Sequence, residues 1–145
     1  MKKLLGLILI SISLFALDLT YTKAFKEFQK GKRLEKTNPQ EANYHYKKAY
    51  ELLKSIENQN SSQLHYMLGE MYAHGLGVEQ NYKLAEEHFL KAIKLGNKRA
   101  HCCLAKVYLE EGKKELAQKH LQFALSNPTI ANYCKEMNKT FKEKK

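Results

Sequence analysis

Residues 64–100 read LHYMLGEMYAHGLGVEQNYKLAEEHFLKAIKLGNKRA, and this stretch decides the fold. Large apolar residues and alanines recur in it at spacings of three and four, which places them on one face of a helix. The pattern predicts one helix over 62–74 and another over 81–95. Gly75-Leu76-Gly77 lies between them as a turn signal, and Gly96-Asn97 follows the second. The stretch therefore predicts two helices joined by a tight turn.

The same pattern returns along the chain. The first-helix residues Leu68 and Tyr72 recur 36 positions later as Leu104 and Tyr108. A second-helix signature occurs three times, as Ala42, His45, Tyr46, Ala49; Ala85, His88, Phe89, Ala92; and Ala117, His120, Leu121, Ala124. No segment alternates apolar and polar residues long enough to predict a strand. Repetition at this period indicates a helical-repeat protein.

We therefore predict an all-α fold, a right-handed α-solenoid of about three helix-turn-helix repeats with a C-terminal capping helix. The predicted helices cover about 21–36, 40–57, 62–74, 81–95, 98–111, 113–126 and 129–142. The repeat units are then about 21–57, 62–97 and 98–126. The cap over 129–142 has an apolar face made of Ile130, Tyr133, Met137 and Phe141.

The amino terminus has the layout of a secretory signal peptide. Met1-Lys2-Lys3 is followed by an apolar run over residues 4–17, which is shorter than the roughly 20 residues that cross a bilayer as a helix. We expect a signal peptide over 1–16, cut after Ala16, and a single repeat domain over 17–145. A retained leader that acts as a membrane anchor is the alternative. The expected localisation is periplasmic or secreted.

The chain is basic, with a formal charge of +10 at pH 7. Removal of Lys2 and Lys3 with the leader would leave +8, almost all of it lysine. The charge favours a protein or peptide partner that is acidic or lies at an anionic surface, although a solvated basic surface without a partner explains it too. Nucleic acid is disfavoured because an exported protein rarely meets it.

Residues 64–100 resemble a Sel1-like repeat, which belongs to the tetratricopeptide-type helical repeats. The resemblance lies in glycines, aromatics and alanines that fall in register: Leu68, Gly69, Tyr72, Gly75, Gly77, Ala85, Ala92, Gly96 and Ala100, continued by Leu104, Tyr108, Ala117 and Ala124 in the next repeat. It implies a concave groove, formed by the first helices, that binds peptides or partner proteins. Some secreted, cysteine-rich members bridge the paired helices of each repeat and are described as binding penicillins or hydrolysing β-lactams.

The cysteines allow one bridge with one left over. Cys102 and Cys134 are 32 residues apart, the same offset as between Ala85 and Ala117, so they can lie level on neighbouring helices. We expect a bridge from Cys134 to Cys102 or Cys103, or else three small buried apolar side chains. The spacing does not match a paired metal-ligand motif, so neither a metal nor a cofactor is expected.

Few side chains offer chemistry. His45, His88 and His120 are equivalent positions of successive repeats, too far apart to share one metal ion, so we interpret them as packing residues. Tyr44, Tyr66 and Tyr82 are candidate partner-binding residues, because tyrosine combines a large apolar body with a polar tip. We expect no catalytic residues, and no serine is followed three residues later by the lysine of a serine β-lactamase motif.

The sequence thus favours an exported protein-binding or scaffold module of the bacterial cell envelope, which holds a partner in its groove. An enzyme of the β-lactamase or penicillin-binding kind is one alternative. A membrane-tethered periplasmic adaptor with a retained leader is another.

Overall fold

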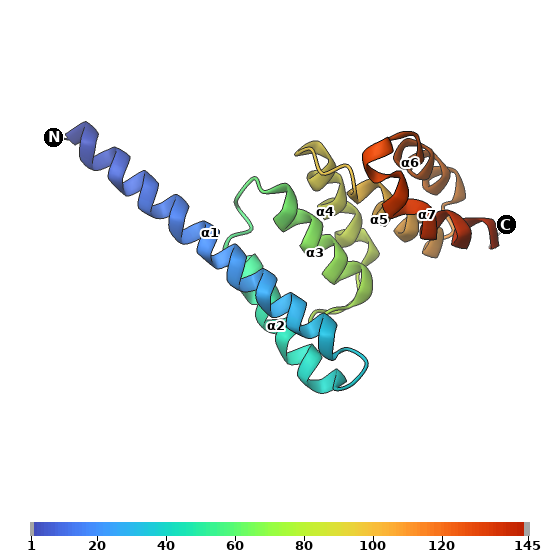
Figure 1. Ribbon diagram of the computed structural model, residues 1–145, viewed down its shortest axis with the longest axis horizontal. Helices are drawn as coiled ribbons and strands as arrows, with labels where there is room; N and C mark the ends of the chain where they lie inside the picture. The colour runs from blue at the N-terminus through green and yellow to red at the C-terminus, as the bar shows by residue number, and fades with distance from the viewer. Residues whose placement is uncertain (1, 144–145) are drawn as a thin grey trace. The chain divides into compact units, whose positions relative to one another are not determined.

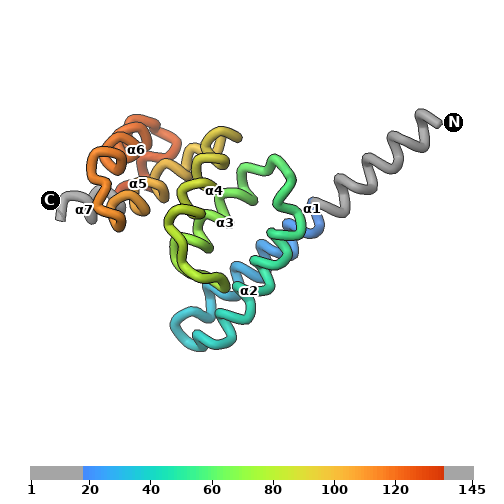
Figure 2. The backbone as a smooth tube through the Cα atoms, turned by 180° about the vertical axis from the view of Figure 1, so that it is seen from behind, coloured from blue at the N-terminus to red at the C-terminus, as the bar shows by residue number. Residues whose placement is uncertain are grey.

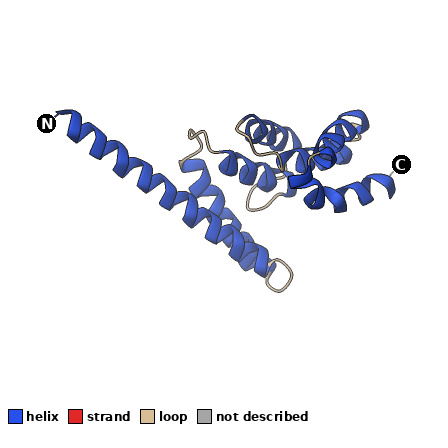
Figure 3. Ribbon diagram, turned by 45° about the horizontal axis from the view of Figure 1, so that its top comes forward, coloured by secondary structure: helices blue, strands red, loops and turns tan. Residues whose placement is uncertain are grey.

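The computed structural model describes the backbone of residues 2–143 and the side chains of residues 18–135. All regular structure in this part of the chain is helical, as Figure 3 shows by colour. The helices are α1 (Lys2–Leu34), α2 (Pro39–Ser55), α3 (Ser62–His74), α4 (Tyr82–Lys94), α5 (Ala100–Glu110), α6 (Lys114–Ser126) and α7 (Pro128–Glu143), labelled in Figure 1. The predicted all-α fold of helix-turn-helix repeats is confirmed.

The first helix is longer than the pattern predicts. It begins at Lys2 and not near residue 21, and it runs without a break to Leu34. Residues 2–20 contain no proline, and Gly6 is their only glycine, so no strong helix breaker ends the helix in this segment. The predicted signal peptide lies in residues whose side chains are outside the described part. Among the residues that are described in full, no helix has both the length and the apolar character needed to cross a membrane.

The chain divides into two compact units, residues 1–59 and residues 60–145. The boundary falls between the first predicted repeat and the second. The first unit holds α1 and α2, which lie side by side as a hairpin (Figure 1). The second unit holds α3 to α7, where α3 pairs with α4, α5 pairs with α6, and α7 packs on α6 and α5 (Figure 2).

In the first unit, the hairpin is closed by a capped turn and an aromatic contact. Asn38 caps α2 by accepting the N–H of Glu41 at 3.2 Å, and Pro39 supplies the first helical residue. The rings of Phe28 and Tyr46 pack at 5.5 Å between centroids. These contacts bury one face of each helix and leave the other face exposed to solvent.

In the second unit, α3 and α4 approach closely because one helix has no side chain at the contact. A Cβ added at Gly69 would lie 2.6 Å from the ring of Phe89, closer than packed atoms come. Gly75 ends α3 with a φ of 65°, a left-handed conformation that glycine adopts without strain. Asn81 then caps α4 by accepting the N–H of Leu84. The tight turn predicted from the glycines is present.

Candidate functional site

The second unit contains a hollow of about 400 Å³ on the side of its first helices. Its walls come from α3, α4, α5, α7 and the loop that leads into α4. We call this hollow the groove. Its lining mixes charged and aromatic side chains, among them Glu70, Lys106, Glu110, Tyr82 and Tyr133. Such a mixture of apolar area and a few polar groups is typical of a ligand-binding surface.

A cluster of hydroxyl and thiol groups joins three helices at the groove. The hydroxyl of Tyr66 on α3 lies 2.6 Å from the hydroxyl of Tyr133 on α7 and 3.3 Å from the sulfur of Cys103 on α5. It also donates to the carboxylate of Glu70 at 3.4 Å. On the other side, the guanidinium of Arg99 lies 5.6 Å from the centre of the Tyr133 ring. The cluster therefore ties α7 to α3 and α5.

These groups stay protonated at neutral pH. Burial, with the nearby carboxylate of Glu70, raises the pKa of the Cys103 thiol to about 11. Burial likewise raises the pKa of Tyr133 to about 12, and it raises the pKa of Tyr66 as well. A thiol attacks as the thiolate, so Cys103 is not poised as a nucleophile. The cluster can form hydrogen bonds with a ligand.

The three tyrosines predicted to bind a partner lie in different places. Tyr82 lines the groove, where its hydroxyl accepts a hydrogen bond from Gln80 at 3.3 Å. Tyr66 stands behind the groove wall, since its hydroxyl contacts two lining residues, Cys103 and Tyr133. Tyr44 belongs to the first unit, where it is 59% exposed and carries Lys48 over its ring. The structure thus brings two of the three to one site.

Tyr133 is a groove residue that the sequence did not reveal. The periodicity assigned it to the apolar face of the cap, yet its side chain is 45% exposed and lines the groove. Ile130 and Cys134 are the buried residues of the described part of α7. A signal was present, since Tyr133 is adjacent to a cysteine with a candidate partner on α5. Met137 and Phe141, the other predicted cap residues, lie outside the residues whose side chains are described.

The structure selects one of the two cysteine pairings that the sequence left open. Cys102 on α5 and Cys134 on α7 are paired in a disulfide, with Cα atoms 5.6 Å apart, and both side chains are fully buried. Cys103 points to the groove and remains a free thiol. The bridge joins the last repeat to the terminal helix and not the two helices of one repeat. It therefore differs from the bridging of the cysteine-rich group.

Each repeat of the second unit contains a pair of histidines, one on its first helix and one on its second. The Nδ1 atoms of His65 and His88 are 3.0 Å apart, and those of His101 and His120 are 2.8 Å apart. The ring centroids lie 5.3 Å apart in the first pair and 5.0 Å apart in the second. In each pair the two centroids and the two Nδ1 atoms therefore lie nearly on one line, so the two rings share a hydrogen bond. The rings point at each other and not at a common third point where a metal ion would sit.

Desolvation opposes protonation of the second pair. It lowers the pKa of His101 to about 4, with a further contribution from His120, and it also lowers the pKa of His120. A tyrosine on the first helix of the same repeat packs on each pair, Tyr72 on His88 and Tyr108 on His120. No group of three histidine, cysteine or carboxylate side chains that could hold a metal ion occurs among the described residues.

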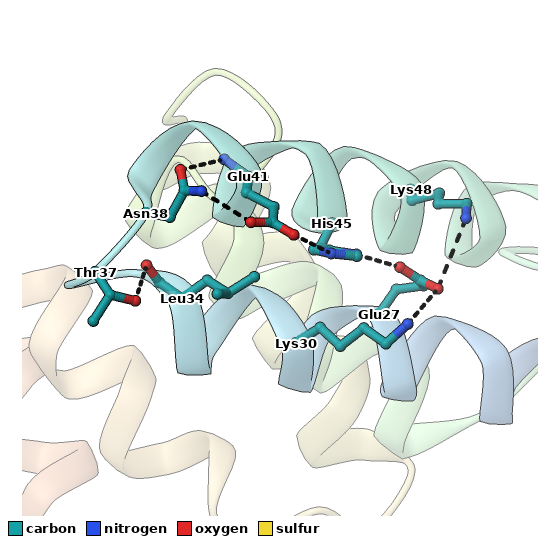
Figure 4. A network of polar contacts seen from close by, with 8 residues as sticks. All are labelled: Glu27, Lys30, Leu34, Thr37, Asn38, Glu41, His45 and Lys48. Carbon is teal, nitrogen blue, oxygen red and sulfur yellow. Dashed lines mark hydrogen bonds and ion pairs between the residues drawn. The ribbon is translucent and has the colours of Figure 1, made fainter.

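The first unit places a carboxylate where the other repeats have the first histidine. His45, equivalent to His88 and His120, contacts the carboxylate of Glu27 through Nδ1 at 2.6 Å (Figure 4). Lys30 and Lys48 approach the same carboxylate at 3.8 Å each. The hydrogen bond from His45, together with these lysines, lowers the pKa of Glu27. The network thus satisfies an ionised carboxylate between α1 and α2.

Paired helices that recur with similar small-residue contacts, a polar pair at equivalent positions and a groove on one side define a helical-repeat protein of the interaction type. The chain is a Sel1-like repeat protein, because the Sel1 repeat model matches residues 24–52 and 62–97. The first match covers the end of α1 and most of α2, and the second covers α3 and α4. No curated protein and no solved structure matches the chain. Sel1 repeats generally mediate protein–protein interactions.

Proposed function

We propose that this protein is an exported binding module that holds a segment of a partner protein in the groove of its second unit. The observation that carries the proposal is the groove itself, a hollow of about 400 Å³ whose walls come from the first helices of two repeats, from α4 and from α7. Aromatic side chains such as Tyr82 and Tyr133 supply rigid contact area at low entropic cost. Sel1 repeats generally serve this kind of purpose.

The charge of the chain supports a partner that is acidic or lies at an anionic surface. The formal charge is +10, whereas the groove lining holds two carboxylates, Glu70 and Glu110, and one lysine, Lys106. The excess positive charge therefore lies outside the groove, where it steers a partner from a distance and adds little to the contact itself. Raising the ionic strength should slow association. A rate of association that does not depend on salt would contradict the acidic partner.

Binding in the groove is tested with short peptides selected by phage display against the full oxidised chain. We expect Tyr82→Ala to weaken the selected peptides about tenfold, as truncation of an aromatic anchor does. Lys106→Ala is a second groove variant. Leu90→Ala is the matched control, because Leu90 is exposed on α4 and does not line the groove. Peptides that bind the groove variants and the control equally well would show that the groove is not the binding surface.

Export is supported by the basic head and the short apolar run of residues 4–17. The test is to measure the mass of the chain recovered from the producing bacterium. The mass should match a chain that begins near Leu17. A chain that keeps its leader and sediments with membranes would favour the tethered adaptor instead.

A further inference from the structure

The described part of α7 is held in place by few side chains, and one of them is a bridge cysteine. Ile130 and Cys134 are its buried residues, and Cys134 is joined to Cys102 on α5. The loop that this bridge closes spans 32 residues and includes all of α6. Cross-linking over a loop of this size lowers the conformational entropy of the undocked chain. Docking of α7 therefore depends strongly on the bridge.

The residues next to both bridge cysteines form part of the groove. Tyr133, which precedes Cys134, lines the groove and contacts the hydroxyl of Tyr66 on α3. Cys103, which follows Cys102, lines it from α5 and contacts the same hydroxyl. The disulfide thus lies directly behind the groove wall. Whatever fixes the two cysteines also fixes the two lining residues beside them.

We propose that oxidation completes the groove: forming the Cys102–Cys134 bridge docks α7, brings Tyr133 into the wall and so switches the module into its binding state. The reaction is thiol–disulfide exchange with a disulfide-bearing oxidant. The thiolate of one cysteine attacks the oxidant's disulfide, and the other cysteine then displaces the oxidant's sulfur. Two electrons and two protons leave the cysteine pair, one S–S bond forms, and the oxidant is released as a dithiol. The proposal rests on the proposed function, since it concerns the regulation of the same groove.

Cys103 is kept out of this exchange. Its sulfur contacts the hydroxyl of Tyr66, and burial keeps it in the unreactive thiol form. The alternative bridge from Cys103 to Cys134 would remove that thiol from the groove. The free cysteine therefore forms part of the groove wall, and the buried cysteine pair beside it provides the redox switch.

The test compares three states of the full chain: the oxidised wild type, the wild type reduced with dithiothreitol, and Cys134→Ser. Leu90→Ala is the control, because Leu90 is exposed on α4, does not line the groove and leaves the bridge intact. Two quantities are measured for each: the affinity for a groove-selected peptide, and hydrogen–deuterium exchange over residues 128–135. We expect reduction and Cys134→Ser each to weaken peptide binding and to speed exchange about tenfold or more, with the control close to wild type.

The two measurements separate failure of the inference from failure of the proposed function. Slow exchange over residues 128–135 in the reduced chain would overturn the inference, because α7 would then stay docked without the bridge. Fast exchange with unchanged peptide affinity would overturn it too, since the groove would not need the docked helix. Absence of any groove-binding peptide would reject the proposed function, while the exchange data would still decide whether oxidation docks α7. The reduced wild type covers the case in which Cys134→Ser does not fold.

Discussion

The close approach of Gly69 to Phe89 leads to a prediction about stability. Whether Gly69→Ala stabilises or destabilises the fold should depend on the residue at position 89. Alanine is a better helix former than glycine by about 1 kcal/mol, so Gly69→Ala within α3 would stabilise an isolated helix. In the folded unit the new methyl group would lie 2.6 Å from the Phe89 ring. Overpacking of this kind typically costs about 1–3 kcal/mol. A contact as short as 2.6 Å belongs in the upper part of this range, about 2–3 kcal/mol, so after the helix gain of about 1 kcal/mol we expect Gly69→Ala to lower the free energy of unfolding by about 1–2 kcal/mol.

The same substitution should be harmless when the ring is absent. Phe89→Leu removes the rigid ring edge and leaves a flexible branched side chain, which can make room for one methyl group. In that background we expect Gly69→Ala to be neutral or to stabilise by up to about 1 kcal/mol. The double-mutant cycle should then give a coupling energy of about 2 kcal/mol. The third repeat provides the precedent, because it has Ala105 and Leu121 at these two positions and both are buried.

The assay is urea unfolding of the full chain, followed by helical circular dichroism, for the wild type, the two single variants and the double variant. Gly31 and Tyr46 provide an independent repetition in the first unit, since a Cβ at Gly31 would lie 2.7 Å from the Tyr46 ring. A Gly69→Ala variant as stable as the wild type, or one equally destabilised with and without Phe89, would refute the close-contact reasoning.

Three further outcomes follow from other contacts. The pKa of His101 is lowered to about 4 in the folded chain, so stability that is present above pH 6.5 should be lost as the pH falls toward 4. After allowance for partial exposure, the free energy of unfolding should fall by about 1–2 kcal/mol. His101→Phe should make the free energy of unfolding less dependent on pH, as urea titrations at pH 7 and 4.5 would show. Glu27→Gln should cost about 0.5–1 kcal/mol at pH 7 and nothing once the pH falls below the lowered pKa of the carboxyl, as thermal unfolding at both pH values would reveal. Alkylation of the unreduced, unfolded chain should label Cys103 alone, and labelling of all three cysteines would rule out the bridge between Cys102 and Cys134.

Periodicity was enough to predict the helices but not the contacts between them. From residue 39 onward each helix begins and ends within two residues of its predicted bounds, because caps and glycine turns act locally. The resemblance of Gly31 to Gly69 was missed because the first repeat is offset by 38 residues and not by 36. Its position became clear only when the structure placed it against Tyr46, the equivalent of Phe89.

The groove was predictable as a face but not as a set of residues. Repeat register correctly directs attention to the first helices, and two of the three candidate tyrosines lie at the groove or directly behind it. The sequence did not identify Tyr133 as a groove residue, because helical periodicity does not distinguish a buried residue from one at the rim of the buried face. Its position follows from the bridge between Cys102 and Cys134, a long-range constraint that local patterns do not contain.

The three repeats fill one partly buried polar position with different chemistry, and this difference separates the two units. A histidine on the second helix always has a polar partner on the first, which is Glu27 in the first unit and His65 or His101 in the second. An imidazole that gains a proton beside a carboxylate forms an ion pair, whereas one that gains a proton beside another imidazole loses its acceptor when the second ring is protonated too. Desolvation lowers the pKa of both His101 and His120, so mild acid works against this pair. Because this pair lies between α5 and α6, in a repeat that lines part of the groove, acidification should weaken the second unit.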